Sequence, residues 1–144
     1  MKAWLLWLPL LLAAGPAAAD AAGLTIKDPV MRAVAPGVPN TAGYLTIVNA
    51  GPRPDRLLSA SCACARRVEV HLSHVMNGAA MMMDAGPLQI PAHGQVAFAP
   101  GGYHLMVTGL KLPLKDGESQ QVTLKFEHAG TLVVPFAVKA KIGG

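Results

Sequence analysis

Short runs in which apolar and polar residues alternate recur along most of the chain and predict β-strands. The clearest run is "QVTLKFEH", where Val122, Leu124 and Phe126 alternate with polar residues. Because residues i and i+2 of a strand share a face, this strand should have one buried and one solvated face. The run continues through "AGT" into "LVVPFAV", so residues 121–138 predict a β-hairpin. Pro135 interrupts the second strand and favours an edge position or a bulge there.

Ten such runs occur, and no stretch of useful length has the period of a helix. The predicted strands cover residues 24–34, 42–50, 55–62, 66–73, 79–86, 87–92, 95–100, 103–110, 120–128 and 131–140. The separators are rich in Gly, Pro, Asn and Asp, as in "APGVPN" and "KDGES". Many short strands between turn signals are typical of a small all-β sandwich or barrel.

The N-terminal residues follow a different pattern. Lys2 precedes an apolar run that ends in small residues, which is typical of a secretory signal peptide. The run is shorter than the roughly 20 residues of a membrane span. We place the cleavage after Ala19, with Ala22 as the second choice. Residues 1–19 are therefore the expected signal peptide, and residues 20–144 the expected single domain.

Composition narrows the function classes further. The chain has 144 residues, with 12 Lys and Arg against 8 Asp and Glu, a net charge of +4 that falls to +3 without Lys2. These charges are scattered and aromatic residues make up only 5% of the chain, so nothing indicates nucleic-acid binding. No later run is long enough to span a membrane, and we expect a soluble protein after cleavage. No Ser-His-Asp, paired-carboxylate or open zinc motif supports an enzyme.

The only two cysteines are Cys62 and Cys64. An exported protein could join them in a disulfide, but one intervening residue makes a very small ring that would stabilise little, so the spacing argues against it. Two readings stay open, a pair of small half-buried thiols and a redox or metal role.

Potential ligands for a soft metal concentrate in "VEVHLSHVMNGAAMMMDAG". Within thirteen residues it contains two histidines and four methionines, namely His71, His74, Met76, Met81, Met82 and Met83. A second pair, His104 and Met106, shares one strand face in "GYHLMVTG". Thioether and imidazole together favour Cu(I), whereas zinc prefers thiolate, imidazole or carboxylate. The competing interpretation is that the methionines simply fill gaps in the core.

The spacing of four of these residues resembles the signature of the periplasmic copper chaperone family PCuAC. Ten residues separate His71 from Met82, twenty-one separate Met82 from His104, and one separates His104 from Met106. The similarity extends over most of residues 42–138. It implies a cupredoxin-like or Ig-like antiparallel β-sandwich that binds Cu(I) through these two histidines and two methionines.

Some positions depart from the family pattern or lie outside it. The family usually has an aromatic residue near Met31 and a more polar residue between its methionines than "AMMMD" offers, so Met81 or Met83 could replace or supplement Met82. Glu69 shares a face with His71 and could orient its imidazole. Auxiliary ligands could come from His74 and Met76, or from the two cysteines, whereas we assign no role to the turn histidines His93 and His128.

The resemblance implies a periplasmic, monomeric carrier that delivers Cu(I) to an apo-metalloprotein. It points to a copper centre of cytochrome oxidase as recipient and to a Sco-type thiol protein as co-worker. Two other classes compete with it. A cupredoxin-type electron-transfer protein would need Cys62 or Cys64 at the metal. A metal-free Ig-like binding module would use the methionines as an adaptable surface.

Overall fold

The computed structural model describes residues 20, 21 and 23–143, and the expected signal peptide, residues 1–19, lies outside the described residues. The strands are β1 (Asp20–Ala21), β2 (Leu24–Arg32), β3 (Asn40–Asn49), β4 (Asp55–Cys62), β5 (Ala65–Met76), β6 (Ala79–Asp84), β7 (Leu88–Ile90), β8 (Gly94–Ala97), β9 (Tyr103–Leu110), β10 (Ser119–Phe126) and β11 (Gly130–Lys139). Each predicted run overlaps one of them. In this part of the chain, no helix has the length and apolar character needed to cross a bilayer.

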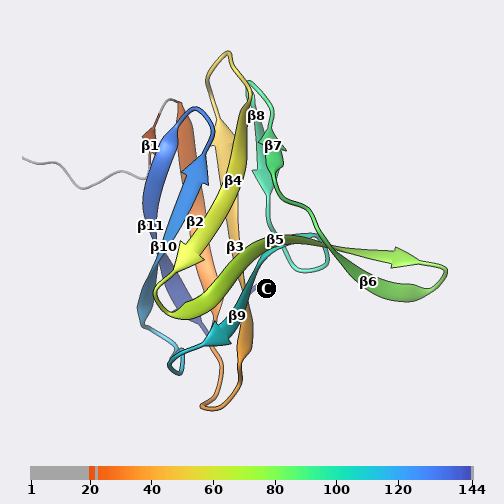
Figure 1. Ribbon diagram of the computed structural model, residues 1–144, viewed down its shortest axis with the longest axis vertical. Helices are drawn as coiled ribbons and strands as arrows, with labels where there is room; N and C mark the ends of the chain where they lie inside the picture. Colours follow the sequence, from red (N-terminus) through yellow and green to blue (C-terminus); the bar gives the residue numbers. More distant parts are fainter. Residues whose placement is uncertain (1–19, 22, 144) are drawn as a thin grey trace, which may run out of the picture.

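The strands form a sheet that curves round on itself. Its order is β1-β2-β11-β10-β4-β5-β9-β3-β8, and an additional pairing of β2 with β3 closes the ring (Figure 1). The predicted all-β sandwich is thereby confirmed. One detail differs from the antiparallel expectation, because β2 and β11 pair in parallel. The predicted hairpin is β10–β11, with Val122 opposite Val134 and Phe126 opposite Gly130.

The core follows from alternation along each strand. Val122, Leu124 and Phe126 of β10 are at most 2% exposed, and Leu105 and Val107 of β9 are fully buried. Neighbouring residues of a strand point to opposite faces. His104, beside Leu105, and Met106, between Leu105 and Val107, therefore lie on the outer face of the sandwich. The side chains with metal-binding chemistry on β9 therefore lie outside the hydrophobic core.

Gly109 lets β9 approach the start of β5 closely. Its φ is +69°, and a Cβ at this position would lie 2.9 Å from Cβ of Arg66. Only glycine combines this backbone conformation with so short a contact. The pairing of β5 with β9 then runs from Ala65 opposite Leu110 to Leu72 opposite Tyr103. This long pairing fixes the register of the two strands that carry the histidines.

A buried carboxylate ties the β10–β11 turn to the start of β4. Burial of Asp55 disfavours its ionisation, but the N–H groups of His128, Arg56 and Ala129 donate to its carboxylate oxygens. These hydrogen bonds outweigh burial and hold the pKa of Asp55 below its usual 3.8. His128 thus contributes through its backbone to the scaffold.

The predicted strand at residues 79–86 pairs with the strand predicted at residues 66–73, which extends further than predicted, and the two form a β-hairpin. Strands β5 and β6 pair from His71 opposite Asp84 to Met76 opposite Ala79, and the hairpin projects from the sandwich (Figure 1). Its turn is Asn77-Gly78, with φ values of 51° and 78°. Asn-Gly favours two-residue hairpin turns because both residues tolerate positive φ. The sequence signal was present, but the predicted strand ended at residue 73.

Candidate metal centre

His71 of β5 and His104 of β9 lie directly opposite each other in the strand pairing. Both occupy the outer face, because the neighbouring Val70 and Leu105 are buried in the core. The two imidazole ring centroids are 6.0 Å apart in a T-shaped arrangement. With metal–imidazole bonds of about 2.0–2.1 Å, two rings on one ion have centroids at most about 6.5 Å apart. The spacing therefore fits two imidazoles that share one metal ion.

Hydrogen bonds determine which nitrogen of each imidazole is free. Nε2–H of His71 donates to Oε2 of Glu69 at 3.3 Å, and Nδ1–H of His104 donates to the carbonyl oxygen of Gly102 at 3.1 Å. A neutral imidazole carries one N–H, so Nδ1 of His71 and Nε2 of His104 keep their lone pairs. Both of these nitrogens are buried without a hydrogen-bond partner among the described residues. Buried nitrogens that accept no hydrogen bond are what a pair of metal ligands would show in the metal-free protein.

Met106 adds a sulfur to the same face. It follows His104 by two residues on β9 and lies opposite Glu69 of β5. The side chain is half-buried, because it lines a groove of about 290 Å³ together with His104 and Met82. Three of the four expected ligands thus border one groove, and the fourth, His71, lies across from His104.

The hairpin register distinguishes Met82 from its two neighbours. Met82 lies opposite Ser73, two residues beyond His71 on β5, so Met82 and His71 share a face of the strand pair. Met81 and Met83 lie opposite His74 and Leu72 and occupy the other face. Of the three adjacent methionines, Met82 is therefore the one on the side of the two paired histidines. Its side chain is 53% exposed, in contrast to His104 at 5%.

Charged side chains lie around the candidate site, but none of them is one of the four expected ligands. Glu69 contacts both His71 and Arg67, whose guanidinium lies 3.7 Å from the carboxylate. Arg32 lines the groove, a position that the sequence reasoning missed because nothing in the pattern of β2 distinguishes it. Within residues 20, 21 and 23–143, no three His, Cys, Asp or Glu side chains converge as a metal site. The other donors on this face are the sulfurs of Met82 and Met106, which favour a soft ion such as Cu(I).

The two cysteines do not reach this face. Contrary to the expectation from their spacing, Cys62 and Cys64 form a disulfide, and both are buried. They lie where the chain turns from β4 into β5, and the backbone N–H of Cys64 donates to the sulfur of Cys62. This turn brings the two side chains together, which spacing alone could not reveal. Six residues of the extended β5 segment separate Cys64 from His71, a span of about 20 Å, so neither sulfur supplies the thiolate of a blue-copper centre.

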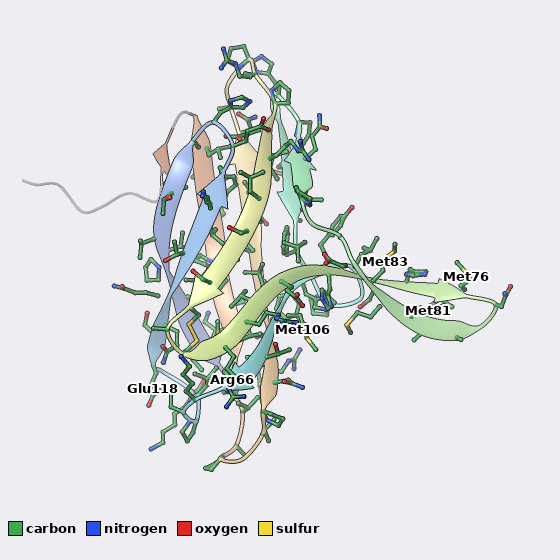
Figure 2. All side chains as sticks on the ribbon, viewed as in Figure 1. Arg66, Met76, Met81, Met83, Met106 and Glu118 are labelled. Atoms are coloured by element: carbon green, nitrogen blue, oxygen red, sulfur yellow. A yellow bond between two sulfur atoms is a disulfide. The ribbon has the colours of Figure 1, made fainter. Side chains whose placement is uncertain are left out.

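The remaining histidines and methionines lie elsewhere. His93 is in a turn with φ of 50°, and its backbone N–H donates to Gly51. His74 and Met76 lie on the projecting hairpin, as do Met81 and Met83, whereas Met106 lies on the body of the sandwich (Figure 2). The expected site therefore gathers around the β5–β9 pair, and a second set of potential ligands is left over on the hairpin.

Comparisons with known proteins identify the family of the chain. The family described as "Putative lipoprotein LpqE-like" matches residues 24–138. The relative "Putative lipoprotein Lxx21020" of Leifsonia xyli is 32% identical over 121 residues, which are 83% of this chain and 72% of the relative.

Solved structures extend the similarity to copper-binding domains. A copper-bound PCuAC domain from PmoF2 is 30% identical, with a TM-score of 0.72 over 85% of this chain and 97% of that domain. Apo-DR1885 from Deinococcus radiodurans is 34% identical, with a TM-score of 0.66 over 100% of this chain and 97% of DR1885. The CuI form of DR1885 is 32% identical, with a TM-score of 0.65 over 91% of this chain and 86% of that one. These similarities confirm the predicted cupredoxin-like β-sandwich.

Proposed function

The chain belongs to the LpqE-like family and to the PCuAC family of copper-binding domains, and from this premise we propose that it is an exported carrier of Cu(I). The ion would be bound by His71, Met82, His104 and Met106. The observation that carries the proposal is the pair of opposed histidines, each with a buried nitrogen that has no hydrogen-bond partner. Both nitrogens lie on the face that holds the two methionines. Imidazole and thioether form a donor set suited to Cu(I).

The arrangement suits a carrier more than a permanent copper protein. His71, His104 and Met106 come from the long β5–β9 pairing, whose register is fixed. Met82 comes from the projecting hairpin and is half exposed. An incoming ligand from a partner protein can displace Met82 while three donors still hold the ion. Copper would then pass between proteins by ligand exchange without entering solution.

The cellular setting is part of the same proposal. Residues 1–19 would direct export and be removed, and the mature domain, residues 20–144, would act in the periplasm as a monomer that transfers copper and catalyses no reaction. Its recipient would be an apo-metalloprotein, with a copper centre of cytochrome oxidase as the first candidate and a Sco-type thiol protein as co-worker. Mass spectrometry of the exported protein tests the cleavage, because an N-terminus other than Asp20 or Gly23 would refute it.

An anaerobic Cu(I) titration of residues 20–144 against a chromophoric chelator tests the site. Native protein should bind copper tightly, and a His104→Ala, Met106→Leu double variant should lose this binding. His128→Ala is the matched control, because His128 lies at the β10–β11 turn, outside the β5–β9 pair, and the substitution keeps its backbone hydrogen bond to Asp55. Equal affinity of native and double-variant protein would refute the site.

Delivery needs a second experiment. Copper-loaded protein is mixed with the apo copper domain of a cytochrome oxidase, the two are separated, and the copper in each is measured. Copper should reach the oxidase domain faster than it reaches a chelator that binds Cu(I) with equal affinity. If it stays with the carrier while the titration succeeds, the site stands and the recipient is wrong.

A further inference from the structure

The face of the β5–β6 hairpin that points away from the proposed copper site carries a second set of soft ligands. Alternation places His74 and Met76 of β5 on this face, together with Met81, which lies opposite His74, and Met83, which lies opposite Leu72. We propose that this face is a second Cu(I) site, formed by His74, Met81 and Met83, with Met76 available as a fourth donor. The site goes beyond the proposed carrier function, which uses only the opposite face of the same hairpin.

The strand register brings the three principal donors within reach of one ion. His74 and Met81 are directly opposite each other. Directly opposed residues have Cβ atoms about 4.5–5.5 Å apart, so an imidazole and a thioether can converge above them. Met83 follows Met81 by two residues, about 7 Å along β6. The long, unbranched side chain of methionine spans that offset.

An unpartnered nitrogen independently points to a ligand. Among the described residues, three buried side-chain nitrogen or oxygen atoms have no hydrogen-bond partner, and all three are imidazole nitrogens. Two belong to His71 and His104 and lie at the first proposed site. The third is Nδ1 of His74, on the hairpin. Because buried polar atoms are nearly always paired, the same explanation that applies to the first two applies to His74.

The chemistry of the face selects the ion. Met76, Met81 and Met83 are 48–53% exposed, so their sulfurs are accessible from solvent. The only carboxylate of β6, Asp84, lies opposite His71 and therefore on the other face. A donor set of neutral sulfur and one imidazole binds soft monovalent copper and is a poor match for zinc, which prefers anionic or nitrogen ligands. We expect weaker binding than at the first site, because these donors are more exposed and lie on a two-stranded projection.

Methionine methyl NMR separates the two sites in one experiment. Residues 20–144 contain six methionines, since the chain has seven and Met1 is removed. The protein is labelled with ¹³C-methyl methionine and titrated anaerobically with Cu(I). The first equivalent should shift the signals of Met82 and Met106, and the second should shift those of Met81 and Met83. Met31 is fully buried in the core and serves as the internal reference.

The possible outcomes distinguish this inference from the proposed function. If Met82 and Met106 shift but Met81 and Met83 stay unchanged through several equivalents, the second site is refuted and the carrier site stands. If Met81, Met82 and Met106 all shift together and binding ends at one equivalent, the hairpin supplies a single site and the inference is also wrong. If only Met81 and Met83 shift, the second site stands and the proposed carrier site fails.

Variants provide the complementary test. A His74→Ala, Met81→Leu, Met83→Leu triple variant should reduce the stoichiometry from two Cu(I) to one and leave the shifts of Met82 and Met106 intact. Val75→Ala is the matched control, since Val75 is 74% exposed on the same hairpin but on the opposite face. A circular dichroism spectrum equal to that of the native protein shows that the triple variant is folded. A folded triple variant that still binds two ions would overturn the assignment.

Discussion

Removing the carboxylate of Glu69 should weaken Cu(I) binding although Glu69 is not itself a proposed ligand. Its Oε2 accepts a hydrogen bond from Nε2 of His71, and this bond keeps the proton off Nδ1. Without it, the ring can rotate or carry its proton on Nδ1, the nitrogen that we assign to the metal. The Glu69→Ala variant must then reorganise His71 before copper binds.

The geometry sets the expected size of the loss. Partners that orient a metal-binding histidine are typically worth 10–100-fold in metal affinity. The bond to His71 is 3.3 Å, longer than the roughly 2.7–2.9 Å of a strong charge-assisted hydrogen bond, and the side chain of Glu69 is 35% exposed. The effect should therefore lie near the lower limit, about tenfold, which corresponds to about 1.4 kcal/mol. Glu69→Gln keeps an oxygen acceptor, so its loss of Cu(I) affinity should be much smaller than that of Glu69→Ala.

Competition with a chromophoric Cu(I) chelator under anaerobic conditions measures these affinities. Arg67→Ala is the control, because Arg67 contacts the same carboxylate at 3.7 Å but its side chain is 68% exposed and it is not a proposed ligand. Its affinity should stay within about twofold of the native value, as for an exposed ion pair. Unchanged affinity in Glu69→Ala would refute the orienting role. Equal losses in the Ala and Gln variants would show that charge, and not the hydrogen bond, is responsible.

Three further predictions follow from the same contacts. Met82→Leu should weaken Cu(I) binding at the first site at least tenfold in the chelator competition. Met83→Leu should leave that affinity within about twofold of the native value, because Met83 occupies the other face of the hairpin. Equal losses in the two variants would contradict the assignment of Met82 to the histidine face. Asp55→Asn should lower the free energy of unfolding at pH 7 by about 2–4 kcal/mol in urea denaturation, since an amide cannot accept all three N–H groups. Because the pKa of Asp55 is lowered in the folded state, its stabilising contribution is present above about pH 4 and is lost as the pH falls through the folded pKa. The difference in unfolding free energy between native protein and Asp55→Asn should therefore shrink at pH 3. A difference that stays constant would refute the charge argument. Cys62→Ser, Cys64→Ser should bind Cu(I) with native affinity, because the disulfide lies about 20 Å along β5 from the site; a clear loss would contradict this placement.

Periodicity was enough to predict most of the fold. Two predicted strands, residues 55–62 and 103–110, coincide with β4 and β9, because Pro54 and Gly102 mark where they begin. The parallel pairing of β2 with β11 could not be predicted, since it depends on which strands meet after the sheet curves. The β5–β6 hairpin was shortened for a different reason. Its second strand was predicted, but residues 74–76 of β5, His-Val-Met, are too short a run to show a period-2 pattern.

The candidate site was predictable as a set of residues but not as an arrangement. The resemblance to the PCuAC signature implied His71, Met82, His104 and Met106 as ligands, and the alternation of β9 placed the last two on one face. Spacing could not show that the two histidines are opposite each other, because strand register is set by long-range pairing. The same limitation applied to the cysteines, whose disulfide depends on the tight turn between β4 and β5.

The unpartnered nitrogens connect the fold of the metal-free protein to its proposed copper chemistry. A buried polar atom without a partner costs about 1–3 kcal/mol, and the described residues contain three such atoms, on His71, His74 and His104. The long β5–β9 pairing and the hydrophobic core hold two of these imidazoles in place despite that cost. A bound ion would satisfy the free nitrogens and stabilise the folded protein by mass action. The exposed methionines of the hairpin carry no comparable cost, because a thioether needs no hydrogen bond. In the proposed site, His71, His104 and Met106 would be preorganised on the β5–β9 pair, and Met82 of the projecting hairpin would be the ligand that exchanges. This division would let one small β-sandwich both hold copper and release it.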